Sequence, residues 1–228
     1  MHFRHSDDVW AAFPELAAGV LTAGAPAAPV DDRLAAFHTE AKSRLAGSPL
    51  SALPEIGAWR RAFSRMGLKP TQYRCAAESL LRRFAKEGSL PRIHPLVDLC
   101  NAVSMAYAVP VAALDLDRID GNLEVRPADG REVYVPLSGG SEHPAPGEIV
   151  FADTAGNAHA RRWTNRQSGL SAVRPGTARV LIVAEAMHDG AAGDVGALLD
   201  TLAAELDTLG AAPSRPALLT RADPGFTC

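Results

Sequence analysis

The stretch that decides the fold spans residues 90–133 and reads LPRIHPLVDLCNAVSMAYAVPVAALDLDRIDGNLEVRPADGREV. Its first part carries apolar residues at helical spacing, which predicts a helix over residues 94–107. Short runs that favour strands then follow, with Gly, Pro and Asp turns between them, at residues 122–126, 132–136, 149–153 and 179–184. Helical segments followed by a series of strands predict an α+β domain.

Further elements are expected on both sides of this stretch. The apolar spacing predicts a short helix at residues 9–13, a strand at 16–22, helices at 31–47, 53–66 and 70–88, and a final amphipathic helix at 194–209. The tail from residue 211 is rich in Pro, Ser and Arg and is expected to be loose. The helices therefore gather in the N-terminal half of the chain.

Composition names no partner by itself. The 228-residue chain is 47% hydrophobic and carries a formal net charge of −3, which is ordinary for a soluble globular protein. Its three cysteines have no CxxC spacing, so neither a disulfide framework nor a Cys-based zinc site is expected. The start of the chain lacks a secretory signal, and no window approaches the ~18 apolar residues of a membrane span. We expect a cytoplasmic protein with no membrane partner.

The distribution of charge is more informative than its sum. Residues 60–92 contain nine basic and two acidic side chains within a chain whose total is negative. On the helix expected at 70–88, Arg74, Glu78 and Arg82 lie opposite the apolar stripe, so that face should be solvated and positive. Such a surface suits nucleic-acid phosphates. The alternative is an ordinary solvated helix face.

The stretch at 90–133 resembles the editing region, called the B3/B4 domain, of the phenylalanyl-tRNA synthetase beta subunit. That family has a segment of the form VVDVTNYV followed by GQPMHAFDLDKI.G.I.VR.A..GE. The counterparts here are Val97, Asp98, Asn101, Val103, Pro110, Asp115, Asp117, Ile119, Gly121, Val125, Arg126, Ala128, Gly130 and Glu132. The match continues more loosely to Gln167. The segment from Trp59 through GLKPTQYRCAAESLLRR resembles free-standing versions of this module, which lack the synthetase catalytic core.

The resemblance implies a fold of the B3/B4 type, with mixed or antiparallel sheets flanked by helices. Residues 1–210 would form a single domain. Within it we expect a helical portion at 31–88, a sheet-rich portion at 90–186 and a C-terminal helix at 194–209, followed by a loose tail at 211–228.

The function implied by the resemblance is a trans-acting aminoacyl-tRNA deacylase that hydrolyses the ester of a mischarged tRNA, in translation quality control. Its partner would be aminoacylated tRNA, with the amino-acid moiety as substrate. No cofactor and no metal are expected, because HExxH, Ser-His-Asp context, phosphate-loop motifs and paired ligand spacing are absent from the sequence. Two alternatives stay open: a non-catalytic module that binds tRNA or a small ligand, and a metabolic enzyme or sensor that reuses the amino-acid pocket for a free amino acid or an acidic metabolite.

The resemblance and the residue chemistry select a candidate site. Asp98 and Asn101 share one helical face and are expected, with Arg166, to act in catalysis. The expected substrate-binding residues are His94, Arg162, Trp163, Asn165, Gln167 and Glu185. The expected tRNA-binding residues are Arg60, Arg61, Arg74, Arg82, Arg83 and Lys86. The bland alternatives are that Asp98 pins a loop, Asn101 satisfies buried backbone, His94 is structural, Trp163 is a core residue and Glu185 forms a salt bridge.

Two departures from the family pattern bear on specificity. Ala112 stands where the family has a histidine that helps place the substrate, and the segment RRWTNRQS replaces a glycine-rich strand and turn. Gln167 falls at or beside the family's glutamate, which helps recognise the hydroxyl of a misattached tyrosine. A pocket built from these residues should be narrower and more cationic, and should prefer a smaller or more polar amino acid than tyrosine.

Overall fold

Two β-sheets and six α-helices make up the computed structural model, which describes residues 1–228. The helices are α1 (Asp7–Ala12), α2 (Asp31–Gly47), α3 (Pro54–Arg65), α4 (Ala76–Glu87), α5 (Pro95–Tyr107) and α6 (Ala191–Thr208). The strands are β1 (His2–His5), β2 (Ala17–Gly24), β3 (Val111–Asp115), β4 (Leu123–Pro127), β5 (Val133–Tyr134), β6 (Ile149–Asp153), β7 (Asn157–Arg161), β8 (Arg166–Gln167), β9 (Arg179–Ala186), β10 (Ala217–Leu219) and β11 (Gly225–Thr227). None of the helices combines the length and apolar character needed to cross a bilayer.

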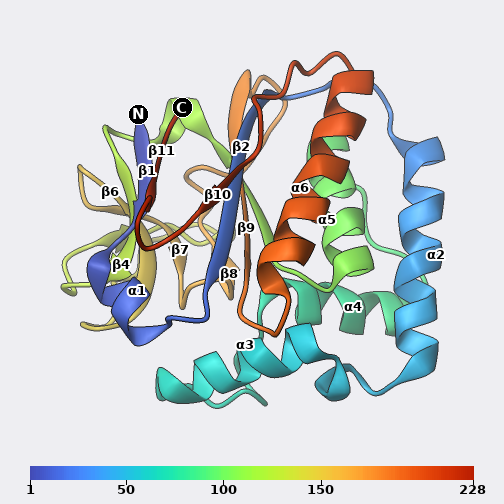
Figure 1. Ribbon diagram of the computed structural model, residues 1–228. Coiled ribbons are helices and arrows are strands. Elements are labelled where there is room, and N and C mark those ends of the chain that lie inside the picture. The colour runs from blue at the N-terminus through green and yellow to red at the C-terminus, as the bar shows by residue number, and fades with distance from the viewer.

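The two sheets confirm the predicted α+β class with mixed and antiparallel pairing. The larger sheet has the order β11-β1-β4-β6-β7-β5, with β8 added to β7, and its β1–β4 and β5–β7 pairs are parallel. The smaller sheet, β10-β2-β9-β3, is antiparallel throughout. Figure 1 shows the larger sheet on the left and the smaller sheet in the middle of the molecule.

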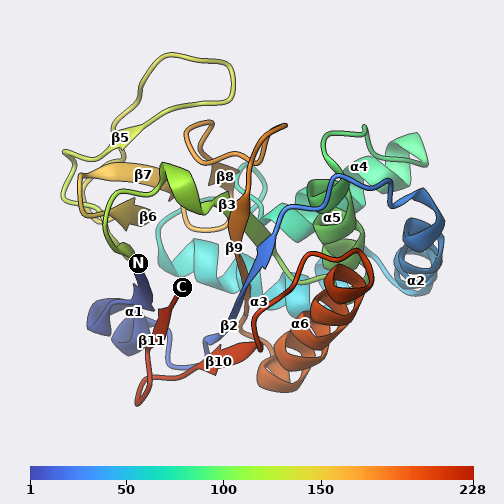
Figure 2. The same ribbon diagram turned by 90° about the horizontal axis from the view of Figure 1, so that it is seen from above.

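The helices cover one face of the smaller sheet. Seen from above, α6, α5 and α2 lie on one side of the strands β2 and β9, and the larger sheet lies on the other (Figure 2). One apolar core, which includes Leu21, Leu99, Ile182 and Leu199, fills the space between these helices and the sheet. Burial of such side chains supplies most of the stabilising free energy. A second core around Trp59 and Trp163 lies between the sheets and α3.

The helix expected at 70–88 begins later than the sequence pattern suggests. Cys75 is its N-cap residue, with Sγ 3.5 Å from the Glu78 amide nitrogen, and the residues before it form a turn in which the Tyr73 amide donates to the Lys69 carbonyl. Tyr73 continues the apolar stripe although it lies outside the helix. Glu78 was expected on the solvated face and is instead buried, because arginines surround its carboxylate.

The C-terminal residues 211–228 differ from the loose tail expected from their composition. Strand β10 pairs with β2, where Leu219 lies opposite Ala18, and β11 pairs with β1, where Phe226 lies opposite Phe3. Each strand is three residues long, which is too short to produce a visible alternation of apolar residues. Phe3 is fully buried, so both ends of the chain contribute to the larger sheet and its core.

Candidate functional site

A cleft opens between the two sheets beneath the segment that joins β7 to β8. Its volume is about 70 Å³, and we call it the Glu185 cleft. It is lined by Ala76, Pro110, Val111, Ala112, Phe151, Ala160, Trp163, Thr164, Asn165, Arg166, Gln167, Val183 and Glu185. The structure therefore brings five of the predicted site residues together: Trp163, Asn165, Arg166, Gln167 and Glu185. The first four are close in sequence, whereas Glu185 follows only after the loop before β9 and most of that strand.

The backbone of the β7–β8 turn is strained. Arg162 and Trp163 have φ angles of 48° and 57°, in the left-handed region that residues with a Cβ rarely adopt. Packing holds the turn in place, because the Trp163 ring lies edge-on to Trp59 at 5.1 Å and to Phe13 at 4.8 Å. The Arg162 guanidinium covers the Tyr73 ring at 4.9 Å. Strain of this kind persists only where the surroundings enforce it, and it concentrates at functional sites.

Glu185 projects from the end of β9 into the cleft. Its Oε1 accepts a hydrogen bond from Trp163 Nε1 at 2.8 Å and lies 2.6 Å from His5 Nε2. Trp59 Nε1 donates to the Glu185 backbone carbonyl at 3.2 Å, so the strand end is fixed as well. Oε2 accepts no hydrogen bond. The carboxylate is therefore anchored by one oxygen and offers the other to the cleft.

The remaining polar residues of the cleft tie its rim to neighbouring elements. Gln167 Nε2 donates to the Ala113 carbonyl of β3 at 2.7 Å, and Asn165 Nδ2 donates to the Arg74 carbonyl at 2.8 Å. Arg166 lies 3.2 Å from the Glu142 carboxylate and is partly exposed. Thr164 Oγ1 is buried and has no hydrogen-bond partner. An unsatisfied hydroxyl of this kind is a ready contact for a polar ligand.

Asp98 and Asn101 line a different depression, which we call the Asn101 hollow. Leu34, His38, Ser89, Leu90, Pro91 and Arg92 complete it. Asp98 Oδ1 accepts a hydrogen bond from the Ile93 amide at 3.0 Å, so this carboxylate pins the loop before α5. The Asn101 side chain makes no hydrogen bond within the protein, and its amide group is free to contact a ligand.

His94 caps α5, because its Nδ1 accepts a hydrogen bond from the Leu96 amide at 3.2 Å. Burial lowers the pKa of this imidazole below its ordinary value, although the nearby negative charge of Asp98 acts to raise it.

A further hollow contains Asn101 together with Val111 and Gln167, both of which also line the Glu185 cleft. This further hollow runs along β3 and joins the Glu185 cleft to the Asn101 hollow.

The arginines and lysines of α3, of α4 and of the loop between them form a basic surface, which is organised around one buried carboxylate. Glu78 accepts hydrogen bonds from Arg60 at 2.6 Å and from Arg82 at 3.0 Å, and Arg74 lies 3.6 Å away. Burial alone would raise the pKa of Glu78, but the hydrogen bonds from Arg60 and Arg82 outweigh it and the pKa is lowered. Three of the six predicted tRNA-binding residues therefore also hold the fold together.

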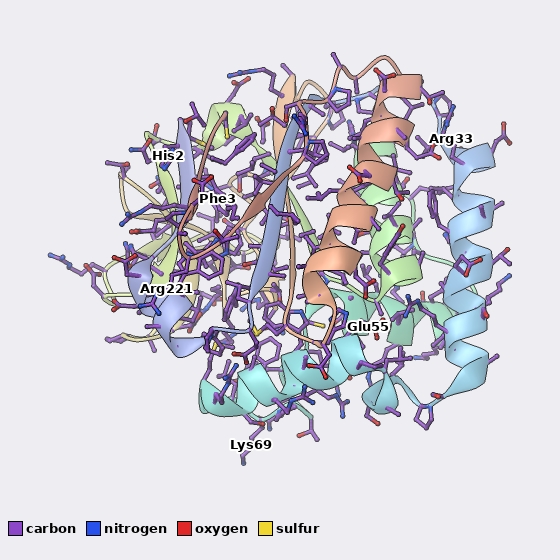
Figure 3. The ribbon with its side chains drawn as sticks, in the orientation of Figure 1. His2, Phe3, Arg33, Glu55, Lys69 and Arg221 are labelled. Carbon is purple, nitrogen blue, oxygen red and sulfur yellow. The ribbon has the colours of Figure 1, made fainter.

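The other basic residues of this surface are more available. Arg83 pairs with Glu87 one turn along α4 at 2.8 Å, and both side chains are about half exposed. Arg61, Lys69 and Lys86 are exposed and have no carboxylate partner. Lys69 extends from the lower edge of the molecule (Figure 3). The Asn165–Arg74 and Arg162–Tyr73 contacts connect this surface directly to the strained turn above the Glu185 cleft.

Several residues of the site could not be predicted from the sequence. His5 lies on β1, a strand too short to predict, and meets Glu185 across 180 positions of the chain. Thr164 belongs to the segment RRWTNRQS, but nothing in the sequence distinguishes its hydroxyl from a solvated one. Trp59 is a buried core residue, and its Nε1 donates a hydrogen bond to the Glu185 carbonyl.

A histidine between an aspartate and a serine occurs elsewhere in the molecule. His159 lies 3.1 Å from Asp153 Oδ2 and 2.8 Å from Ser171 Oγ. His159 and Ser171 are fully buried, so the Ser171 hydroxyl is not open to a substrate. The three side chains link β6, β7 and the segment before β9.

Comparison with known proteins places the chain in a family. The B3/4 domain profile matches residues 58–194. The phenylalanine–tRNA ligase beta subunit of Photorhabdus laumondii is 29% identical over 86 residues, which cover 38% of this chain and 11% of that subunit. The corresponding subunit of Fusobacterium nucleatum is 38% identical over 61 residues, 27% of this chain and 8% of that subunit. The chain thus matches only a small part of each curated relative.

The fold of the chain is similar to that of an N-terminal fragment of the phenylalanyl-tRNA synthetase beta subunit from Pyrococcus horikoshii. The TM-score is 0.51 at 10% sequence identity, and the similarity covers 92% of this chain and 49% of that fragment. The matched residues 58–194 contain α4, most of α3, Asp98 and Asn101 of the hollow, and the polar residues around the Glu185 cleft with the exception of His5. The chain belongs to the B3/4 domain family.

Proposed function

We propose that the chain is a trans-acting aminoacyl-tRNA deacylase that hydrolyses the ester between a misattached amino acid and the 3′ end of a tRNA. One observation carries the proposal: the Glu185 cleft holds a half-anchored carboxylate and an unpaired hydroxyl, and its strained rim contacts the basic surface of α3 and α4. The family relation to a tRNA ligase subunit supports tRNA as the partner.

The basic surface would bind tRNA phosphates beside the cleft. Arg61, Lys69 and Lys86 have no competing carboxylate, and each contact with a phosphate releases counterions, which favours binding at low salt. Asn165 and Arg162 contact residues of the loop before α4, so the basic surface adjoins the rim of the cleft, and the 3′ end of a tRNA bound there would be placed within reach of it.

Within the cleft, the groups of an aminoacyl ester have complementary partners. The free Oε2 of Glu185 would receive the positively charged α-ammonium group. Thr164 Oγ1 and the Arg166 guanidinium would contact the ester carbonyl and stabilise the negative charge that develops on its oxygen. A water molecule attacks the carbonyl carbon, the bond to the ribose oxygen breaks, and the products are a free amino acid and a tRNA with its hydroxyl restored.

The size of the cleft favours a small or polar amino acid. Its volume of about 70 Å³ holds a few groups of the size of a water molecule, and Trp163 fills the space beside it. Gln167 is held by the Ala113 carbonyl and is a neutral hydrogen-bonding group. We therefore expect tyrosine attached to the phenylalanine tRNA to be hydrolysed more slowly than a small or polar amino acid.

A deacylation screen tests the proposal. Radiolabelled aminoacyl-tRNAs, correctly and incorrectly paired, are incubated with the full chain, and the release of amino acid is compared with spontaneous hydrolysis in buffer. We expect at least one mispaired substrate with a small or polar amino acid to be turned over many times. If tRNA binds but no substrate is hydrolysed faster than in buffer, the chain is a non-catalytic binding module and the proposal fails.

A further inference from the structure

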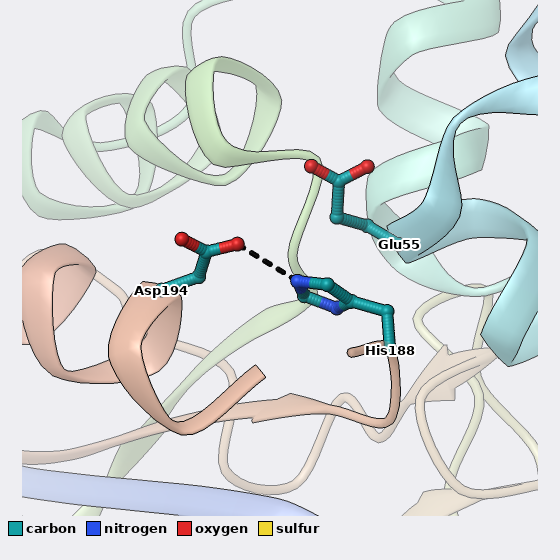
Figure 4. Close-up of side chains that lie close together, drawn as sticks. All are labelled: Glu55, His188 and Asp194. Atoms are coloured by element: carbon teal, nitrogen blue, oxygen red, sulfur yellow. Dashed lines mark hydrogen bonds and ion pairs between the residues drawn. The ribbon is translucent and has the colours of Figure 1, made fainter. Parts of the chain in front are cut away.

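We propose that Glu55, His188 and Asp194 form a binding site for a divalent transition-metal ion, with Zn²⁺ as the preferred ion. Glu55 is the second residue of α3, His188 follows β9, and Asp194 lies in the first turn of α6. One ligand atom from each side chain lies within 4.8 Å of the other two. Glu55 lies beside the lower end of α6 (Figure 3), and the close-up shows the three side chains near one another, with the Asp194 carboxylate hydrogen-bonded to the His188 ring (Figure 4). The cluster lies outside the Glu185 cleft.

Two buried polar atoms of this cluster have no partner, and the unpaired oxygen of Glu55 points to a missing ligand. Glu55 is 7% exposed, and its Oε2 accepts no hydrogen bond. His188 is 8% exposed, and its Nδ1 has no partner either, while its Nε2 lies 2.7 Å from Asp194 Oδ2. An unsatisfied buried polar atom costs about 1–3 kcal/mol. A cation between the three side chains would satisfy the Glu55 oxygen.

The surrounding charge permits a cation. Arg44 lies 2.7 Å from Glu55 Oε1 and neutralises one of the two carboxylate charges, so the cluster keeps a net negative charge when the imidazole is neutral. The N-terminal ends of α3 and α6 are electropositive and oppose the ion. Because the electrostatic potential around the site does not attract cations strongly, the three side chains must coordinate the ion directly.

The ligand set selects Zn²⁺ over Mg²⁺ or Ca²⁺. One imidazole with two carboxylates is a combination that zinc binds in tetrahedral geometry, whereas Mg²⁺ and Ca²⁺ prefer oxygen ligands alone. Tetrahedral zinc places its ligand atoms roughly 3.4 Å apart, so separations of up to 4.8 Å must shrink, and the 2.7 Å contact between His188 Nε2 and Asp194 Oδ2 must lengthen as the ion replaces the shared proton. The Asp194 side chain is half exposed and can move to close the site. A water molecule would complete the coordination.

Such an ion would fasten α3 to the junction between β9 and α6. The same elements support the Glu185 cleft from behind, since Trp59 of α3 holds the Glu185 carbonyl three residues before His188. The sequence gives no sign of the site, because its three ligands lie on separate elements without ligand spacing. The role we assign to the ion is structural.

The test uses the full chain without a histidine tag, freed of metal by a chelator. Zn²⁺ is titrated by calorimetry, and Co²⁺ by the visible absorption typical of tetrahedral coordination. We expect one ion per chain, and at Zn²⁺ about a hundredfold above Kd a rise in Tm of about 5–10 °C. His188→Ala and Glu55→Gln should abolish both signals, and Asp189→Asn, an exposed neighbour outside the cluster, should leave them unchanged.

Two further variants keep the test decisive. Asp194→Asn retains a hydrogen-bond acceptor for His188 on a half-exposed side chain, so it should fold and lose the ion even if His188→Ala does not fold. Cys228→Ser should bind as the unchanged chain does, because burial raises the pKa of this thiol to about 11 and keeps it protonated. Absence of binding to the unchanged chain overturns the proposal, as does undiminished binding by Asp194→Asn and Glu55→Gln together.

Discussion

The Glu185 cleft and the Asn101 hollow are neighbouring depressions that use their polar residues in opposite ways. In the cleft, backbone strain and buried aromatic rings hold a carboxylate with one oxygen unbonded beside an unpaired hydroxyl. In the hollow, Asp98 and His94 are occupied with the backbone of the loop and helix that they belong to, and Asn101 alone is free. Polar residues lie in both depressions, but only the cleft contains a strained backbone and an unsatisfied hydroxyl, both of which lower stability.

Polar residues of the hollow mainly stabilise the fold, whereas polar residues of the cleft remain available to a ligand. Strained φ angles and an unsatisfied hydroxyl each cost stability, and they persist in the Glu185 cleft because Trp163 is packed between Trp59 and Phe13. The contacts of the hollow stabilise the chain by themselves. We therefore propose that the chemistry takes place in the cleft and that Asn101 makes a supporting contact.

The largest expected effect concerns the packing beneath the strained turn. Trp163→Ala should lower the free energy of unfolding by about 3–5 kcal/mol, because the ring is fully buried between aromatic neighbours. Asn101→Ala, the matched change in the hollow, should alter it by less than about 0.5 kcal/mol. Urea denaturation followed by circular dichroism measures both. Equal losses would remove the structural distinction between the two depressions.

The next effect tests whether tRNA approaches from the cleft side. Replacing Arg61, Lys69 and Lys86 together by Gln should weaken tRNA binding about 10–100-fold at low salt, because these exposed cations have no carboxylate partner. The slope of log K against log salt should flatten by up to about 0.9 for each tRNA phosphate that the variant no longer neutralises. Filter binding at several salt concentrations measures this, with Arg131→Gln, an exposed arginine outside this surface, as the control. An unchanged slope would exclude this surface.

A smaller effect compares the carboxylates beside the two depressions. Glu78 is buried among arginines, and Glu78→Gln should cost about 1–2 kcal/mol at neutral pH, whereas Asp98→Asn should cost less, since its arginine partner is half exposed at 3.7 Å.

The cost of Glu78→Gln should depend on pH. The folded pKa of Glu78 lies below its ordinary value of 4.5, so its stabilisation is complete above that pH and is lost as the pH falls through the folded pKa. The difference in stability between the unchanged chain and Glu78→Gln should therefore shrink in acid. A difference that stays constant from pH 7 to pH 3 would contradict this role.

The smallest effect concerns the free amide of the hollow. Asn101→Ala should slow deacylation by about tenfold, as expected for the loss of one hydrogen bond to the bound tRNA end. Single-turnover rates with saturating protein measure it, and Ser89→Ala, an exposed residue of the same hollow, serves as the control. A loss of 10²-fold or more would move the chemistry into the hollow.

Local patterns in the sequence were enough to predict much of the fold. The spacing of apolar residues predicted α2, α3, α5 and α6 closely, because each helix buries a continuous stripe. Strand β6 was predicted at its observed residues. The strands β1, β3, β7, β8, β10 and β11 were not predicted. Strands β1, β10 and β11 are three or four residues long and carry too little alternation, and their pairs β1–β11 and β2–β10 join opposite ends of the chain.

The site was predictable only where its residues are adjacent in sequence. The segment RRWTNRQS was selected for its unusual chemistry, and its residues from Trp163 to Gln167 line the cleft with Glu185. The contact between His5 and Glu185 and the cluster of Glu55, His188 and Asp194 depend on how strands and helices meet in space. The proximity of Asp98 and Asn101 on one helix face was real, but no sequence pattern indicated which depression that face lines.

Glu185→Gln is the decisive variant for the proposed binding of the aminoacyl ester in the Glu185 cleft. The variant keeps an acceptor for Trp163 Nε1 while removing the negative charge offered to the substrate. With the best substrate from the deacylation screen, the account predicts a single-turnover rate lowered by about 10²-fold and a tRNA affinity changed by less than about threefold. A Glu185→Gln variant that is folded, binds tRNA and hydrolyses the ester at the rate of the unchanged chain would contradict the account.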